Sequence, residues 1–474
     1  MHSWSGTTWE TITRRGFLSL YAGSLGGLAL AQMIASAEGK QKSENRGKNR
    51  LGKPVKAKSV ICLFQHGGPS QMDLFDPKPT LQKYHGQAYP KGELEVHFEK
   101  QQGNVLASPF KFRKRGKSGI ELSELLPHTS KIVDDLTMIR SMNTNSVDHE
   151  AALRLIHTGR LQAGMPVWGS WVVYGLGSEN ENLPSYVVLT DPAGLPVDGE
   201  RNWSSGWLPA IHQGTPFRSG NQPVLDLKTP QQLTAQARSN QLKFLESLNR
   251  EHLSRHSENT ELQARLKNYE TAARMQVAVP ELLDFSNETE ETKNLYGLDN
   301  PTTADYGRRC LLARKLVENG VRFVQVYMSG QPWDTHSKNA ENLKNLCATT
   351  DQPSAALVQD LKRKGLLDST IVIWTGEFGR LPISQGTDGR DHNRHAFSTW
   401  IAGGGFKQGY THGATDDFGY KAIQGGVSVH DLHATLLHSL GLDHRKLALE
   451  HDGRETSLTD ADVTGARVVH DLLA

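Results

Sequence analysis

Residues 59–76, SVICLFQHGGPSQMDLFD, carry the clearest sign of architecture in the chain. Residues 59–64 are almost entirely apolar and do not alternate with polar ones, which is typical of a strand covered on both faces of a sheet. A Gly pair and two residues of metal-ligating type, His66 and Asp73, follow at once. Ligands of open α/β sheets bind beyond the carboxyl ends of the strands, so the residues after each strand are the candidates for a functional site.

Similar short runs recur along the chain and alternate with helical patterns. The further strand candidates are 136–140, 185–189, 321–327, 370–374 and 398–401, and helical patterns include 310–319 and 353–364. This alternation predicts an α/β fold, a three-layer sandwich whose mostly parallel central sheet has helices on both faces. Long polar helical segments predict a helical insertion at about 229–300, within one domain that spans 59–474.

Composition excludes several classes of protein. The 474 residues contain 53 Lys and Arg against 51 Asp and Glu, so the net charge of +2 does not favour nucleic acid as a partner. Three Cys cannot form a disulfide framework. With 37% hydrophobic residues the chain is neither disordered nor a multi-pass membrane protein. The unusual feature is 20 His, more than the 14 Phe or 11 Tyr.

The N-terminus has the pattern of an export signal. Arg14-Arg15 precede a Gly/Ala-rich apolar run over 18–34 and an Ala35-Ser36-Ala37 cleavage pattern. These features predict a twin-arginine signal peptide over 1–37 and a basic flexible linker over 38–58. A membrane anchor is the alternative, but the run is shorter than the ~20 residues of a spanning helix. We therefore expect the twin-arginine export machinery as a partner and a periplasmic or extracellular protein, tethered to the membrane if the leader is kept.

Metal-ligating side chains cluster beside the predicted strands. Asp334 and His336 follow one strand, Glu377 follows another, and Asp391, His392 and His395 precede the next. A single His in such a place is more often structural, but clusters beside several strands of one sheet favour a metal centre. Mixed imidazole and carboxylate ligands favour Zn, Mn or Fe over Ca or Mg, and there are enough ligands for one or two divalent ions.

The segment 143–150 leads into a helix and carries further candidates. Asp148 or Ser146 could cap this helix, while its N-terminus could also receive an anionic ester. Arg380, Arg390 and Arg394 lie beside the metal-ligating clusters, where they could hold an oxyanion or neutralise the carboxylates.

The order of these motifs resembles the alkaline-phosphatase and sulfatase superfamily. Thr375-Gly376-Glu377-Phe378-Gly379 matches its T-x-D-H-G motif, and Asp431 and Thr435 fall in the places of its late D-x-x-x-T-L-L helix. More closely, the chain resembles the exported bacterial domain-of-unknown-function family 1501, through the hallmarks QHGGPSQMDLFDPKP, WDTHSKN, GEFGRLP and GRDHNRHAFSTWIAGGG.

The resemblance implies an alkaline-phosphatase-like fold and a metal-dependent hydrolase of phosphate or sulfate esters, and it also shows departures. His149 stands where sulfatases carry the Cys that becomes formylglycine, so an ordinary formylglycine sulfatase is disfavoured. His149 could be a nucleophile or a ligand; otherwise Ser146, Thr144 or a metal-bound hydroxide would attack. Phe378 replaces a His ligand of the superfamily.

The expected site therefore has two metal positions and an anionic substrate. Asp334, His336 and His395 are predicted around one metal, and Glu377, His66, Asp73 and either Asp391 or His392 supply the candidates for the second. His149, Ser146 and Arg394 are the catalytic candidates. The expected substrate is an anionic ester such as a sulfated or phosphorylated saccharide, with Trp203 and Trp207 as a substrate wall or as structural anchors.

Two alternatives from other classes remain open on the sequence. One is a non-catalytic exported protein that keeps the fold and binds a polysaccharide or a partner. The other is a mutase or transferase that works through a covalently modified Ser146 or Thr144.

Overall fold

The computed structural model of the protein describes residues 57–218, 234–255 and 260–474. The predicted signal peptide and nearly all of the predicted linker lie outside the described residues, as do two parts of the predicted insertion, 229–233 and 256–259.

A nine-stranded sheet forms the centre of the described chain. Its order is β13-β5-β12-β9-β1-β8-β6-β7, and β16 also pairs with β5. In chain order these strands are β1 (Ser59–Phe64), β5 (Leu136–Asn143), β6 (Tyr186–Leu189), β7 (Thr215–Phe217), β8 (Phe323–Val326), β9 (Thr370–Thr375), β12 (Phe397–Ala402), β13 (Tyr410–His412) and β16 (Val427–Ser428). All six segments predicted as strands belong to this sheet, so the predicted α/β class is confirmed.

Strand β12 runs against its two neighbours. It is antiparallel to both β5 and β9, whereas the other pairs in the sheet are parallel. An antiparallel strand begins at the edge where its parallel neighbours end. Residues just before β12 therefore reach the same edge as residues just after β1, β8 and β9.

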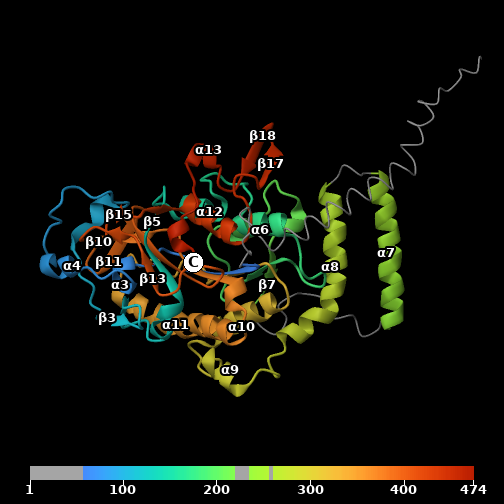
Figure 1. Cartoon of the computed structure of the whole chain (residues 1–474), viewed down its shortest axis with the longest axis horizontal. Helices are drawn as coiled ribbons and strands as arrows, with labels where there is room; N and C mark the ends of the chain where they lie inside the picture. Colours follow the sequence, from blue (N-terminus) through green and yellow to red (C-terminus); the bar gives the residue numbers. More distant parts are fainter. Residues whose placement is uncertain (1–56, 219–233, 256–259) are drawn as a thin grey trace, which may run out of the picture. The chain divides into compact units, whose positions relative to one another are not determined.

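Both faces of the sheet are covered, which explains the uninterrupted apolar strands. In β1, Ile61 and Leu63 point into one hydrophobic core, while Val60, Cys62 and Phe64 point into the other. Helices α10 (Ala304–Glu318) and α11 (Asn339–Arg363) cover the first face. Helices α5 (His149–Thr158), α6 (Trp168–Leu176) and α12 (Val429–Ser439) cover the second, and Figure 1 shows α6 and α12 across the sheet from α10 and α11.

Both helices of the first face begin earlier than the sequence predicts. Helix α11 starts at Asn339 and continues through Pro353, where the prediction begins the helix. Proline cannot donate a backbone hydrogen bond and usually interrupts a helix. Here the buried side chains of Cys347 and Leu357 pack in the same core on both sides of Pro353, and this packing outweighs the local preference.

The region after β7 is helical. Helices α7 (Ala235–Arg255), α8 (Thr260–Leu283) and α9 (Glu290–Leu295) occupy it, and α8 contacts α7 and α10. Met275, Val279 and Leu282 anchor α8 in the first core. In the part of the chain that the structure describes, no helix has the length and apolarity needed to cross a membrane.

A three-stranded sheet, β11-β10-β2, lies next to the candidate site. It consists of β2 (Gln102–Val105), β10 (Gly379–Gln385) and β11 (Gly389–Asn393). The other described α-helices are short: α3 (Gln71–Leu74), α4 (Pro79–Tyr84) and α13 (Ala461–Thr464). The other strands form three pairs: β3 (Phe112–Arg115) with β4 (Ile120–Ser123), β14 (Ala414–Thr415) with β15 (Ala422–Gln424), and β17 (Ala448–His451) with β18 (Arg454–Ser457).

Candidate metal centre

The first group of candidate ligands surrounds one carboxylate oxygen. Asp334 Oδ1 lies 2.9 Å from His336 Nε2, 3.2 Å from His392 Nε2 and 3.3 Å from His149 Nε2. The ligand atoms of these four residues all lie within 4.8 Å of one another. They come from the loop after β8, from β11 and from the first turn of α5.

The second group shares His149 with the first. His149 Nδ1 lies 2.7 Å from Glu377 Oε1, and His66 Nε2 lies 4.0 Å from the same oxygen. His66, His149 and Glu377 again have ligand atoms within 4.8 Å of one another. His149 therefore stands between the two groups, with one ring nitrogen towards each.

Buried polar atoms in the second group have no protein partner. His66 is 0% exposed, and neither of its ring nitrogens meets strict hydrogen-bond geometry with the described residues, although the ring lies near the backbone of Gly330; Glu377 Oε2 also lacks a partner. Buried side-chain polar atoms nearly always have a partner, because leaving one unsatisfied costs about 1–3 kcal/mol. A cation between these ligands would engage one ring nitrogen of His66 and the free oxygen of Glu377, so the second group fits a metal ion.

The geometry of His392 supports a cation in the first group as well. Its Nδ1 donates to the carbonyl oxygen of Val147 at 2.6 Å, so a neutral ring presents the lone pair of Nε2 to Asp334 Oδ1. Burial lowers the pKa of His392 to about 4, which disfavours a proton on that nitrogen. A bound divalent ion would turn this repulsion between a lone pair and a carboxylate into two ligand bonds.

A Gly pair lets three loops approach one another. Gly67 and Gly68 adopt φ of +116° and +77° in the turn after β1. A Cβ on Gly67 would lie 2.3 Å from the backbone nitrogen of Asp334, and one on Gly68 would lie 2.6 Å from the ring of Phe378. The absence of both side chains brings His66 into the same site as Asp334 and Glu377.

Arg380 is a buried orienting residue. Its guanidinium donates to Asp334 Oδ1 at 2.6 Å and to the backbone carbonyls of Gly67, Gly68 and Arg390. These contacts engage the guanidinium with acceptors of the protein itself. Arg380 thus holds the Asp334 carboxylate in place, which agrees with the expectation that it neutralises a carboxylate.

Phe378, which follows Glu377 in the sequence, places an apolar side chain inside the site. Its buried ring packs against His149 with ring centres 4.7 Å apart and against His392 at 4.6 Å. The side chain therefore fixes the orientation of two imidazoles. The ring nitrogens near Glu377 belong to His66 and His149.

The groups are strongly coupled electrostatically. Burial opposes ionisation of Asp334, but hydrogen bonds from His149 and His336 and the charge of Arg380 hold its pKa well below the usual range. Burial acts to lower the pKa of His149, and its bonds to Asp334 and Glu377 outweigh this and raise it to about 9. Without a metal His149 is therefore protonated at neutral pH, and a metal ion would displace that proton.

Five of the predicted ligands and catalytic residues lie outside both groups, namely Asp73, Asp391, Arg394, His395 and Ser146. Asp73 is buried and paired with Arg390, with Arg390 Nε 2.7 Å from Asp73 Oδ2. The Asp391 carboxylate accepts backbone N–H bonds from His97 and Phe98 at 2.8 and 2.9 Å. His395 Nε2 lies 2.7 Å from Glu95 Oε2, and Arg394 Nε lies 2.9 Å from the same carboxylate.

The remaining candidates have structural contacts. The Ser146 hydroxyl accepts from the backbone N–H of Asp148, whose carboxylate caps α5 by accepting from Ala151 N. Trp203 is buried in the second core, and Trp207 stacks on His451 at 4.7 Å. These contacts favour the interpretation of both Trp residues as structural anchors.

Part of the histidine-rich C-terminal region is also structural. His433 and His430 on α12 donate to the carbonyls of Ile156 and Gly159, which end α5 without intrahelical partners. Asp431 forms a capping box with Ser428 at the start of α12. The segment that resembles the superfamily's late helix thus stabilises the helix that carries His149.

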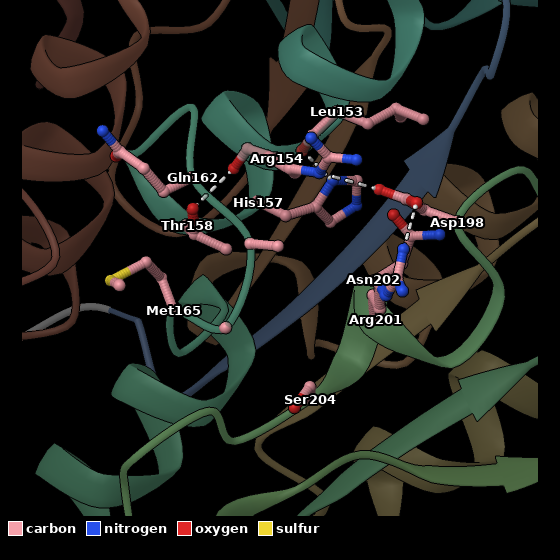
Figure 2. A pocket seen from close by; sticks show the side chains of 12 residues that line it. Leu153, Arg154, His157, Thr158, Gln162, Met165, Asp198, Arg201, Asn202 and Ser204 are labelled. Atoms are coloured by element: carbon pink, nitrogen blue, oxygen red, sulfur yellow. Dashed lines mark hydrogen bonds and ion pairs between the residues drawn. The ribbon is translucent and has the colours of Figure 1, made fainter.

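A pocket of about 140 Å³ opens beside the last turns of α5, away from His149 at the start of the helix. Figure 2 shows Asp198 between Arg154 and Arg201 at its wall. No residue of either metal group is among its lining residues, which are Leu153, Arg154, His157, Thr158, Gln162, Ala163, Gly164, Met165, Asp198, Arg201, Asn202 and Ser204.

Sequence reasoning missed two residues that border the site, His97 and Phe98. The ring of His97 stacks on His392 at 5.0 Å and an angle of 25°, and Phe98 meets His336 edge-on at 5.2 Å. They lie in an irregular segment between α4 and β2, more than 200 residues before the ligands they cover, so no local pattern links them to the site.

Comparisons with known proteins give a family and several distant structures. Residues 57–473 match the family described as "Protein of unknown function (DUF1501)". No curated protein is significantly similar in sequence. The chain is similar to PsFucS1 sulfatase from Pseudoalteromonas sp., at 12% identity and a TM-score of 0.36, over 87% of this chain and 71% of that one.

Two further structures are similar at the same level. One is the phosphonate monoester hydrolase SpPMH from Silicibacter pomeroyi, at 11% identity and a TM-score of 0.32, over 73% of this chain and 72% of that one. The other is a mutant of TAB5 alkaline phosphatase with bound Mg, at 12% identity and a TM-score of 0.31, over 74% of this chain and 92% of that one.

Proposed function

The chain belongs to the DUF1501 family, whose description assigns no activity, and we propose from its site that it is a metal-dependent hydrolase of phosphate or sulfate esters. The ligands proposed for one divalent ion are Asp334, His336, His392 and His149. His66 and Glu377 are the ligands proposed for a second ion, and His149 would bind both ions only as an imidazolate that has lost both ring protons. Their mixed nitrogen and oxygen atoms favour Zn, Mn or Fe.

The observation that carries the proposal is the buried, unpartnered His66. A buried imidazole whose ring nitrogen lacks a hydrogen-bond partner is unfavourable unless something else binds that nitrogen. The neighbouring Glu377 oxygen without a partner supplies the matching charge. Since His149 and Glu377 already touch, the three residues form an incomplete coordination shell.

When bound, the metal ions would supply Lewis-acid stabilisation of the charged oxygens of the ester. The residues of the chain would hold this arrangement. Arg380 would keep Asp334 in place, the Val147 carbonyl would fix the tautomer of His392, and Phe378 would exclude water from the rear of the His149 ring.

The proposed attacking group is water. Both ring nitrogens of His149 face carboxylates, and the Ser146 hydroxyl is engaged with the backbone of Asp148. The oxygen of water would form a bond to phosphorus or sulfur while the bond to the ester oxygen breaks. The departing alcohol would take up a proton, and the other product would be inorganic phosphate or sulfate.

Metal analysis of the purified protein tests the proposal. We expect one or two equivalents of Zn, Mn or Fe in the wild type, and loss of metal in Asp334→Ala and in His66→Ala. His451→Ala is the matched control, because His451 stacks on Trp207 and belongs to neither group. The metal-loaded wild type should then hydrolyse 4-nitrophenyl phosphate or 4-nitrophenyl sulfate.

A folded wild type that binds no metal, and that the two substitutions leave unchanged, would contradict the proposal. That result would favour the non-catalytic polysaccharide- or partner-binding protein. We further propose export by the twin-arginine route, which is supported by Arg14-Arg15 and the apolar run that follows them.

A further inference from the structure

Residues 94–98, here called the strap, cover one side of the first metal group. Leu94 and Val96 pack into a small hydrophobic cluster with Leu381 and Phe418. The residues between and after them, Glu95, His97 and Phe98, are exposed. This alternation is that of an extended segment with one face on the protein and the other towards solvent.

The strap is held by three of the predicted site residues that do not reach the metal groups. The Asp391 carboxylate accepts the backbone N–H groups of His97 and Phe98. Arg394 and His395 both bind the carboxylate of Glu95, and the Tyr420 hydroxyl accepts from the backbone nitrogen of Glu95. The segment is therefore a fixed part of the site's border.

The strap borders the most exposed side chain of the two groups. Among the side chains of the two metal groups, His336 is the most exposed at 26%, whereas His66 and Glu377 are 0% exposed. Phe98 contacts His336 and is itself 39% exposed. An ester that brings its charged group to the metals from the open side would place its alcohol part against the Phe98 ring.

We propose that Phe98 is a specificity-determining residue that stacks on the ring of the substrate's alcohol part, and that the substrates are esters of ring-bearing alcohols such as monosaccharides. This inference rests on the proposed function, because it takes the metal groups as the place of the charged ester. The apolar face of a pyranose ring matches an exposed aromatic side chain. The buried Trp203 and the stacked Trp207 cannot serve as this wall.

Binding measurements on the metal-loaded full chain test the inference independently of turnover. The probes are glucose 6-sulfate and glucose 6-phosphate, with inorganic sulfate and phosphate as ring-free partners. We expect Phe98→Ala to weaken binding of the sugar esters by about threefold to tenfold, the usual range for one aromatic contact, and to leave the inorganic ions unchanged. Phe98→Trp should retain the affinity for the sugar esters.

Phe244→Ala is the matched control, because Phe244 is another exposed phenylalanine, 63% accessible on α7. It should leave all four affinities unchanged. Equal binding of the sugar esters by the wild type and Phe98→Ala would overturn the inference, as would no binding of the sugar esters at all. Failure of the proposed function itself would be seen separately, as a wild type without metal.

Discussion

At the scale of single residues, two histidines three positions apart have different roles. His392 Nε2 faces Asp334, whereas His395 Nε2 faces Glu95 on the strap. We therefore predict that His392→Ala loses metal and that His395→Ala retains it. Metal content by mass spectrometry after equal dialysis of the two variants checks this. If His395→Ala loses metal and His392→Ala retains it, the prediction is wrong and the ligand set expected from the sequence, with His395, is correct.

Phe378 illustrates a residue that acts by packing. Truncation of a buried phenylalanine typically costs about 3–5 kcal/mol, because a cavity replaces its contacts. We predict that Phe378→Ala lowers the free energy of unfolding by this amount and also weakens metal binding, since the rings of His149 and His392 lose their support. Urea denaturation in chelator isolates the packing effect, and Phe98→Ala should change stability far less because Phe98 is exposed.

At the scale of elements, the ion pair between Asp73 and Arg390 ties α3 to β11. Both side chains are fully buried, and Asp73 also accepts from Ser70 and Asn339. Removing one partner of a buried pair typically costs about 3–5 kcal/mol. We predict such a loss for Asp73→Asn at neutral pH, measured by urea denaturation. Asp417→Asn is the control, because its pair with Lys91 is exposed and should change stability little.

The pair between Asp73 and Arg390 also predicts how the stability of the protein changes with pH. Burial opposes ionisation of Asp73, but Arg390, Ser70 and Asn339 outweigh it, and the folded pKa lies below the ordinary value of 3.8. The contribution of the carboxylate to stability is therefore present above pH 3.8 and is lost as the pH falls through the lower, folded pKa. The stability difference between the wild type and Asp73→Asn should shrink in that acidic range; a difference that grows there would contradict this assignment.

The helices and strands were the part of the structure that the sequence predicted best. All six predicted strands are in the central sheet, because these strands are mostly apolar and the polar clusters beside them mark their ends. The start of α11 was not predictable, because Pro353 locally disfavours a helix. Packing against the core nevertheless lets the helix continue through this residue. The choice between His392 and His395 depends on which way each ring points around one turn, and residue order does not encode that direction.

At the scale of the whole molecule, the metal groups join distant parts of the chain. Their residues follow β1, β8 and β9 or belong to α5 and β11. A metal that binds only the folded state stabilises it by about 4 kcal/mol at a thousandfold excess over Kd. We therefore predict that EDTA lowers the Tm of the metal-loaded wild type by several degrees and leaves Asp334→Ala unchanged. Scanning calorimetry checks this, and equal shifts in both proteins would point to an effect of EDTA unrelated to the site.

Export also belongs to the whole molecule. If Arg14-Arg15 form the recognition pair, replacing both with Lys should keep the protein in the cytoplasm. Cell fractionation followed by immunoblotting of the full chain measures the effect. Arg46→Lys with Arg50→Lys is the matched control, because these residues lie in the predicted linker. Periplasmic accumulation of the doubly substituted leader variant would exclude the twin-arginine route.

The reversed direction of β12 has a consequence for the timing of synthesis. This strand pairs with β5, formed some 260 residues earlier, and it fixes the end of the segment that carries His392. Before β12 has emerged from the ribosome, the nascent chain already contains His66 and His149. It cannot yet complete either the sheet or the first ligand set. The proposed metal centre would therefore form late, because its last ligand, His392, is made only when most of the chain has been synthesised.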